Sequence, residues 1–200
     1  MPKSVDFLFD FASPNAYLVH RVLPDFAVRT GATVNYIPCL LGGIFKATGN
    51  QAPFLSFAPI KGKLDYERLE FSRFIKANGI KGFQWNPHFP VNSLLLMRGI
   101  FAAIDQDRLA DYVETGMKAM WEDGLNMADP EVYAATLNAA GFDAQSLLDA
   151  TQDPDIKARL IANTEMAVDR GAFGIPTFYV GDEMFYGKER LAQIEAAVLD

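Results

Sequence analysis

Residues 5–14 have the sequence Val5-Asp6-Phe7-Leu8-Phe9-Asp10-Phe11-Ala12-Ser13-Pro14. The apolar run over residues 5–11, rich in aromatic and branched side chains, predicts a buried strand. Ser13 and Pro14 then predict the start of a helix, because a serine hydroxyl caps free backbone N–H groups and proline suits the first helical position. The chain therefore opens with a strand that leads through a short turn into a capped helix.

The next segments complete a β-α-β unit. Apolar residues recur at helical spacing after Pro14, and Gly31 ends this helix. Residues 33–37 alternate in the manner of a second strand, which Pro38 closes. Two strands joined through a helix normally lie parallel in one sheet.

The middle of the chain is predicted to be helical. Between residues 65 and 170 the apolar positions follow helical spacing, and glycines or Asp-Pro pairs mark the breaks. The predicted helices span residues 66–78, 93–105, 109–121, 130–140, 144–150 and 153–170. No strand is predicted within this block.

Strand character returns near the C-terminus. Residues 176–180 and 183–186 flank Gly181-Asp182, which is a hairpin signal. A final amphipathic helix follows Gly187. Neither half of the chain has enough strands to be stable alone, so the two halves are expected to pair in one sheet.

This order of elements predicts one discontinuous domain and one insertion. Residues 1–64 and 171–200 are assigned to an α/β domain with a thioredoxin-like fold, in the order β-α-β and then β-β-α. Residues 65–170 are assigned to an all-helical domain inserted between its halves. Clefts between a sheet domain and a helical cap are common sites for small ligands.

Composition limits the classes of function. The formal net charge is −7, so no basic stripe for nucleic acid is expected. No apolar stretch is long enough to cross a bilayer, and Asp6 and Asp10 interrupt the first apolar run, unlike in a signal peptide. Cys39 is the single cysteine, which excludes an internal disulfide and favours a reducing compartment. The expected setting is the cytoplasm.

Two motifs supply candidate chemistry. Ser13 lies where backbone N–H groups and a helix dipole favour a negative charge, and its hydroxyl can donate to a bound thiolate. The alternative is that Ser13 only caps the helix, which is the commoner role of serine. A cis bond before Pro176 would aim the backbone of Ile175 at a bound peptide, whereas an ordinary trans proline opening a strand is the alternative.

Several motifs spread along the chain are more specific in combination than any one of them alone. They are Phe9-Asp10-Phe11-Ala12-Ser13-Pro14 with Tyr17-Leu18, Leu41-Gly42-Gly43-Ile44-Phe45 with Gly49-Asn50, Phe89-Pro90, Gly174-Ile175-Pro176-Thr177-Phe178, and Phe185-Tyr186-Gly187-Lys188-Glu189-Arg190-Leu191. In this order the chain resembles the 2-hydroxychromene-2-carboxylate isomerases and the related kappa-class glutathione transferases, which resemble the DsbA-like disulfide oxidoreductases in fold. The resemblance implies that glutathione is the cofactor.

It also implies a role for single residues near the predicted helix start and the later proline. Ser13 would hold the glutathione thiolate, and Asn50 would contact the tripeptide. Ile175, preceding Pro176, would bind the tripeptide backbone. Such a site is chemically coherent, because a donor at a helix N-terminus lowers the pKa of a thiol and raises its nucleophilic fraction.

The γ-glutamyl end of glutathione would meet Lys188, Glu189 and Arg190. The resemblance further implies a basic residue in the stretch that holds Lys61 and Lys63, and Lys61 is taken as the candidate while Lys63 stays open. The sequence departs from the family at two positions. Asn15 follows Ser-Pro where an aromatic residue is frequent, which bears on the substrate, and Glu189 stands where an aspartate is frequent.

The implied activity is that of a glutathione-dependent isomerase acting on 2-hydroxychromene-2-carboxylate or a similar intermediate of aromatic breakdown. Reversible thiolate addition, bond rotation and elimination would leave glutathione unconsumed. A kappa-type glutathione transferase or peroxidase is the alternative, because it shares the same site. The partners implied are glutathione and a small aromatic-derived carboxylate, and relatives of this type are often dimers.

Other classes fit the sequence poorly. A dithiol oxidoreductase needs Cys-x-x-Cys where this chain has Ser13-Pro14-Asn15-Ala16, and Cys39 has no resolving partner. Cys39 is therefore interpreted as a buried apolar residue. His20 and His88 lack partners at ligand spacing, so no metal site is expected. A binding protein without catalysis is a further alternative.

Overall fold

The sheet joins the two ends of the chain. The structure, a computed structural model, describes residues 4–200. Its four strands lie in the order β2-β1-β3-β4, and they span Ser4–Phe9 (β1), Thr33–Pro38 (β2), Thr177–Val180 (β3) and Glu183–Tyr186 (β4). β1 pairs parallel with β2 and antiparallel with β3, and β3 pairs antiparallel with β4. The predicted β-α-β unit, the hairpin and the shared sheet are therefore confirmed.

Helix α1 (Pro14–Thr30) follows β1 and begins at its predicted cap. The side chain of Ser13 accepts a hydrogen bond at the helix start, and Gly31 ends the helix with a positive φ of 67°, a conformation that glycine adopts without steric cost. α1 contacts β2 and also α10 (Leu191–Leu199). The N-terminus of α1 consequently lies at the end of the sheet where β1 stops.

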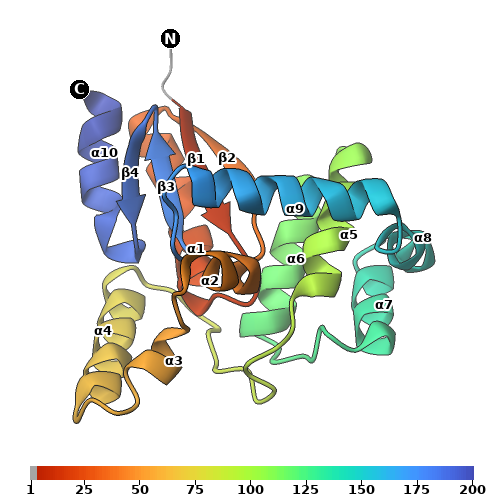
Figure 1. The fold of residues 1–200 in the computed structure, drawn as a ribbon, viewed down its shortest axis with the longest axis horizontal. Helices are drawn as coiled ribbons and strands as arrows, with labels where there is room; N and C mark the ends of the chain where they lie inside the picture. Colours follow the sequence, from red (N-terminus) through yellow and green to blue (C-terminus); the bar gives the residue numbers. More distant parts are fainter. Residues whose placement is uncertain (1–3) are drawn as a thin grey trace.

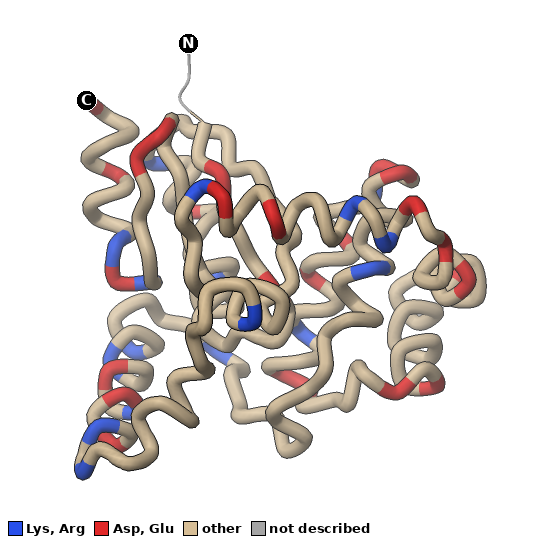
Figure 2. Tube along the Cα trace, viewed as in Figure 1, with Lys and Arg blue, Asp and Glu red and all other residues tan. Residues whose placement is uncertain are grey.

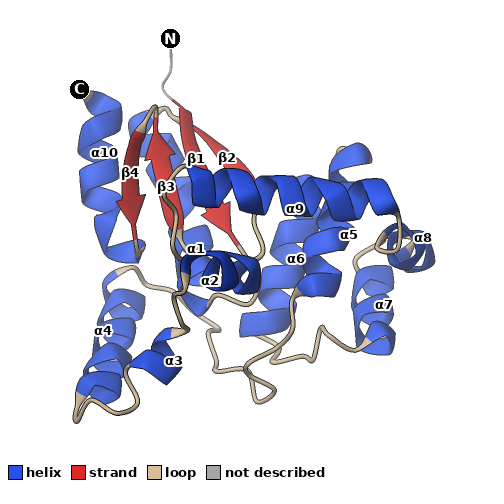
Figure 3. Cartoon of the chain, in the orientation of Figure 1, coloured by secondary structure: helices blue, strands red, loops and turns tan. Residues whose placement is uncertain are grey.

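The predicted helices of the middle segment are present. They are α4 (Lys63–Ala77), α5 (Leu94–Asp105), α6 (Leu109–Trp121), α7 (Pro130–Ala139), α8 (Ala144–Ala150) and α9 (Pro154–Asp169). Figure 1 shows α5 to α8 gathered beside the sheet, while α9 runs back from α8 and packs on β2. α4 lies apart from them, near the end of β4 (Figure 1). Figure 3 shows the strands grouped on one side of this helical group.

Two short helices between β2 and α4 were not predicted. They are α2 (Leu41–Thr48) and α3 (Pro53–Ser56). α2 contains the pair Gly42-Gly43, and glycine is a poor helix former. A Cβ at Gly43 would lie 3.0 Å from the side chain of Thr164 on α9. The glycine therefore allows α2 to pack closely on α9, a tertiary contact that local sequence does not reveal.

The core around the sheet is aromatic. The ring of Phe7 stacks on Phe9 and on Phe178, with centroids 5.6 and 5.3 Å apart, and Tyr36 of β2 meets Phe7 edge-on at 5.1 Å. Phe7, Phe9 and Phe178 have no exposed surface, and burial of a ring of this size stabilises a fold by about 1.5–3 kcal/mol. This core fixes β1, whose end carries the candidate site.

Charges are dispersed over the described residues. Figure 2 shows acidic and basic positions interspersed along α4 and the other helices. Within residues 4–200, no helix is long and apolar enough to span a membrane.

Candidate active site

Ser13 occupies the turn between β1 and α1. β1 ends at Phe9, earlier than predicted, because the chain turns there: the N–H of Ser13 donates to the carbonyl of Asp10 at 3.0 Å. The Ser13 Oγ accepts from the N–H of Ala16 at 3.2 Å and donates to the carbonyl of Ile175 at 3.4 Å. Ser13 is 3% exposed. It is therefore a helix cap whose hydroxyl also meets the segment before Pro176.

The bond between Ile175 and Pro176 is cis. Of the two alternatives predicted from the sequence, the cis bond is therefore the one present. The N–H of Gly187 donates to the carbonyl of Pro176 at 3.0 Å, which ties this loop to the end of β4. A Cβ at Gly174 would lie 3.0 to 3.3 Å from the ring of Tyr186, so the loop fits tightly beside that ring. Residues distant in sequence thus hold Ile175 against Ser13.

Asn50 lies next to the same loop. It follows Gly49, which ends α2 with a φ of 71°, and its Nδ2 donates to the carbonyl of Phe173 at 2.7 Å. Asn50 is exposed. Its side chain is therefore available at the surface while the hydrogen bond orients it toward the segment that precedes Ile175.

The segment η1 (Lys188–Arg190) is a short 3-10 helix that contacts α1. Lys188 is only 5% exposed. Its Nζ lies 2.5 Å from Oε1 of Glu189 and 5.5 and 5.8 Å from the ring centroids of Phe71 and Phe74 on α4. A buried ammonium is stable only with such a partner. Between α4 and η1, Lys188 and Glu189 line a hollow of about 210 Å³.

The two lysines near α3 differ in their contacts. Nζ of Lys63 pairs with Glu67 at 2.8 Å and lies 4.7 Å from the ring centroid of Phe57. Lys61 is exposed in the connection between α3 and α4, which Figure 1 shows at the end of the molecule away from the sheet. The structure thus brings Ser13, Ile175 and Asn50 together around one loop, and it does not bring Lys61 to them.

Two further residues near Ser13 were not predicted to belong to the site. The indole Nε1 of Trp121, on α6, donates to the carbonyl of Phe11 at 2.8 Å, which anchors the turn to the helical part. Asp10 is fully buried beside the turn. Its only sequence signal is a charged residue inside an otherwise apolar run, which is expensive to bury and therefore informative.

The remaining candidates behave as ordinary structural residues. Cys39 has no exposed surface, and burial raises the pKa of its thiol to about 12, so it is not a reactive thiolate. Burial likewise raises the pKa of Tyr17 to about 12. In the part of the chain that the structure describes, no group of three or more His, Cys, Asp or Glu side chains is arranged to hold a metal ion.

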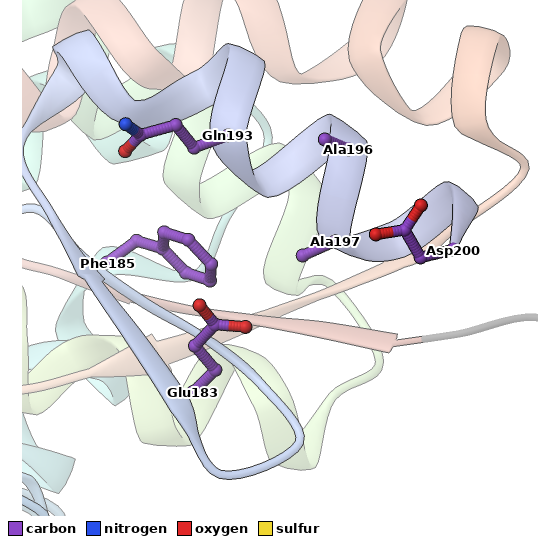
Figure 4. Close-up of a pocket in the computed structure, with 6 residues that line it drawn as sticks. All are labelled: Glu183, Phe185, Gln193, Ala196, Ala197 and Asp200. Atoms are coloured by element: carbon purple, nitrogen blue, oxygen red, sulfur yellow. The ribbon is translucent and has the colours of Figure 1, made fainter.

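A second hollow, of about 550 Å³, lies between β4 and α10 (Figure 4). It is lined by Glu183, Phe185, Gln193, Ala196, Ala197 and Asp200. Glu183 pairs with Val180 at the turn of the hairpin, whereas Thr177, next to Pro176, pairs at the opposite end. This hollow contains none of the predicted site residues and is remote from Ser13 along the strand.

The fold and this site define the class of protein. Residues 4–199 match the family model described as "DSBA-like thioredoxin domain". The chain therefore belongs to that family, and its fold is the DsbA-like thioredoxin fold, with a mixed sheet and many helices.

Closer relatives narrow the class. A 2-hydroxychromene-2-carboxylate isomerase from Pseudomonas putida is 31% identical over 97% of this chain and 93% of its own length. A solved structure of a 2-hydroxychromene-2-carboxylate isomerase has a TM-score of 0.83 at 30% identity, with 97% of this chain and 93% of that chain covered. Human glutathione S-transferase kappa 1 is 25% identical over 96% of this chain and 88% of its own length. The chain is thus a member of the 2-hydroxychromene-2-carboxylate isomerase family.

Proposed function

We propose that this protein is a glutathione-dependent isomerase of 2-hydroxychromene-2-carboxylate or of a similar aromatic-derived carboxylate. The observation that carries the proposal is the Ser13 hydroxyl at the N-terminus of α1, in contact with the carbonyl of Ile175. The relatives named as isomerases supply the reaction class, and the relative named as a glutathione transferase supports the cofactor.

The residues present fit glutathione. A hydroxyl donor at a helix N-terminus suits a thiolate, and the backbone of Ile175 suits a peptide group. Glu189 offers a carboxylate to an ammonium group, and Lys188 and Arg190 offer cations to a carboxylate. Asn50 would contact the tripeptide beside Ile175. Lys61 is proposed as a further contact, although it belongs to the remote connection between α3 and α4.

In this proposal the bound cofactor supplies a thiol nucleophile that adds reversibly to the conjugated substrate and leaves unconsumed. The chain supplies position and electrostatics. Ser13 donates a hydrogen bond that favours the ionised thiol, and the N-terminus of α1 adds its partial positive charge. Ile175 fixes the orientation of the cofactor backbone, so that the nucleophile approaches the substrate from one direction.

The decisive assay measures interconversion of the chromene carboxylate with and without glutathione. We expect turnover only when glutathione is present, with the glutathione recovered unchanged. Ser13→Ala should lower kcat by about 10²-fold or more, as the loss of one catalytic donor does, while Cys39→Ser, which alters a buried thiol, should remain active. If glutathione instead ends up attached to 1-chloro-2,4-dinitrobenzene and the chromene acid is not converted, the protein is a kappa-type transferase.

Two further proposals concern the setting of the protein. A single, buried, free cysteine is compatible with the reducing cytoplasm, and fractionation of the source cells tests this localisation.

A homodimer is supported by exposed apolar side chains on and between α3 and α4, namely Phe54, Leu55, Ile60, Tyr66 and Leu69. Light scattering on the purified protein distinguishes a dimer from a monomer.

A further inference from the structure

Asp10 is a buried acid without a cationic partner. It has no exposed surface, and among the described residues no Lys, Arg or His forms an ion pair with it. Asp6, on β1 just before this turn, has the ordinary arrangement, with Arg170 at 3.1 Å and a partly exposed side chain. Burying a carboxyl group costs free energy. The buried carboxyl group of Asp10 therefore needs other polar contacts that offset this cost.

Hydrogen bonds provide these contacts from three directions. Oδ1 accepts from the N–H of Ala12 at 2.8 Å, and Oδ2 accepts from the N–H of Leu41 at 2.7 Å. The Ser93 side chain forms a further hydrogen bond with the carboxyl group. Ala12 directly precedes Ser13, Leu41 is the first residue of α2, and Ser93 is the residue before α5. One carboxyl group therefore joins the Ser13 turn to the starts of two helices.

The backbone of Asp10 belongs to the same arrangement. Its carbonyl accepts from the N–H of Ser13 at 3.0 Å, so both the side chain and the main chain of Asp10 shape the turn. Burial raises the pKa of this carboxyl group, while the hydrogen bonds from Ser93, Ala12 and Leu41 oppose the rise. An apolar residue here would leave the part-buried N–H groups of Ala12 and Leu41 without these acceptors, which is more costly than never forming the bonds.

We infer that Asp10 is a positioning residue of the active site: its carboxyl group fixes the turn against α2 and so holds the Ser13 hydroxyl at Ile175. The inference rests on the proposed function, in which Ser13 stabilises the cofactor thiolate. Catalytic donors act only when held close to the productive geometry. Asp10 touches neither cofactor nor substrate in this scheme and acts through the placement of Ser13.

The test compares wild type with Asp10→Asn and with the matched control Asp6→Asn. An asparagine at position 10 keeps the shape but sets an NH₂ group against one of the two backbone N–H groups. The first measurement is the pKa of the glutathione thiol when bound. We expect Asp10→Asn to raise it by about one unit, which is a tenfold loss of thiolate at a pH below the pKa. Asp6→Asn should leave it unchanged.

The second measurement, amide hydrogen exchange in the absence of glutathione, is independent of the proposed function. In Asp10→Asn the amides of Ala12, Ser13 and Leu41 should exchange roughly tenfold faster or more, with α7 unaffected. If Asp10→Asn does not fold, Ser93→Ala, which removes one bond to the carboxyl group, should show the same local change at smaller size.

The outcomes separate the two claims. A wild-type thiol pKa equal to that of free glutathione refutes the proposed function, and the exchange data then still decide whether Asp10 orders the turn. An unchanged or lowered thiol pKa in Asp10→Asn overturns the positioning role. Uniformly faster exchange throughout the chain also overturns it, because Asp10 would then affect only global stability.

Discussion

Ser13 performs two tasks with one hydroxyl group. As a cap, its oxygen accepts from the N–H of Ala16, and this bond leaves the single hydroxyl proton free to donate elsewhere. In the structure that proton is directed to the carbonyl of Ile175 at 3.4 Å, a long hydrogen bond. A bound thiolate would be a stronger acceptor than this carbonyl. Capping and catalysis are therefore compatible readings of Ser13 rather than competing ones.

At the residue scale, the structure confirms two features whose signals are local. The cap at Ser13 and the proline at 176 carry signals in their immediate neighbours. Asp10 carries almost none, because its hydrogen-bond partners at Leu41 and Ser93 come from other segments of the chain. The assignment of Lys61 followed from a resemblance and stays a prediction. Roles that depend on distant partners were beyond local patterns.

Glu189 offers a prediction at this scale. Glu189→Gln should weaken glutathione binding at least about tenfold, since a hydrogen bond to a charged group contributes about 1.5–3 kcal/mol. The variant also removes the partner of the buried Lys188 ammonium. Titration calorimetry measures the affinity. Glu183→Gln, at the start of β4 and at the remote hollow, is the control and should bind normally. Equal affinities for both variants would remove Glu189 from the site.

At the scale of elements, periodicity predicted every strand of the sheet and the six helices α4 to α9 of the middle segment. The failures were α2 and α3, which are short and, in α2, rich in glycine. A glycine is needed at position 43 because a Cβ there would crowd Thr164 of α9, and local sequence does not reveal this neighbour. The early end of β1 at Phe9 has a similar cause, because the Asp10 hydrogen bonds replace ladder bonds from that point.

Packing between α6 and the turn gives an element-scale prediction. A Cβ at Gly116 would lie 2.5 Å from the ring of Phe11, so Gly116→Ala should lower the free energy of unfolding by about 1–3 kcal/mol through overpacking. At Gly42, on α2, a Cβ meets nothing within 4 Å. Gly42→Ala should instead be neutral or stabilising by up to about 1 kcal/mol. Urea unfolding measures both, and a harmless Gly116→Ala would contradict the packing described.

Over the whole molecule, a polar network joins α1 and β2 to α6. His20 of α1 contacts the hydroxyl of Tyr36 at 2.8 Å and Oε2 of Glu114 on α6 at 3.0 Å. Arg21 donates to both oxygens of Glu114 and also pairs with Glu122. These contacts hold α1, which begins at Ser13, in a fixed position against α6. Local sequence patterns do not indicate these contacts, since the partners lie far apart along the chain.

The network makes stability depend on pH. The hydrogen bond with His20, followed by that with Arg21, lowers the pKa of Glu114 to about 2, although burial opposes the shift. Because the folded-state pKa lies below the unfolded value, the stabilisation is fully present above about pH 4.5. It is lost as the pH falls toward 2. The difference in unfolding free energy between wild type and Glu114→Gln should therefore shrink over this range.

The control for this experiment is Glu165→Gln, which alters an exposed carboxylate on α9. Its unfolding free energy should stay close to that of the wild type at each pH. A gap between wild type and Glu114→Gln that stays constant from pH 6 to 2 would contradict the role given to Glu114.

The central claim is that Ser13 stabilises the thiolate of bound glutathione, and a pH titration of thiolate absorbance tests it most directly. We expect the bound thiol in the wild-type protein to have a pKa about one to two units below the free value, because a hydrogen bond to a charged group contributes about 1.5–3 kcal/mol. In Ser13→Ala the pKa should return toward the free value. Glutathione bound with the same unshifted pKa in both proteins, or not bound at all, would contradict the account and leave Ser13 as a helix cap.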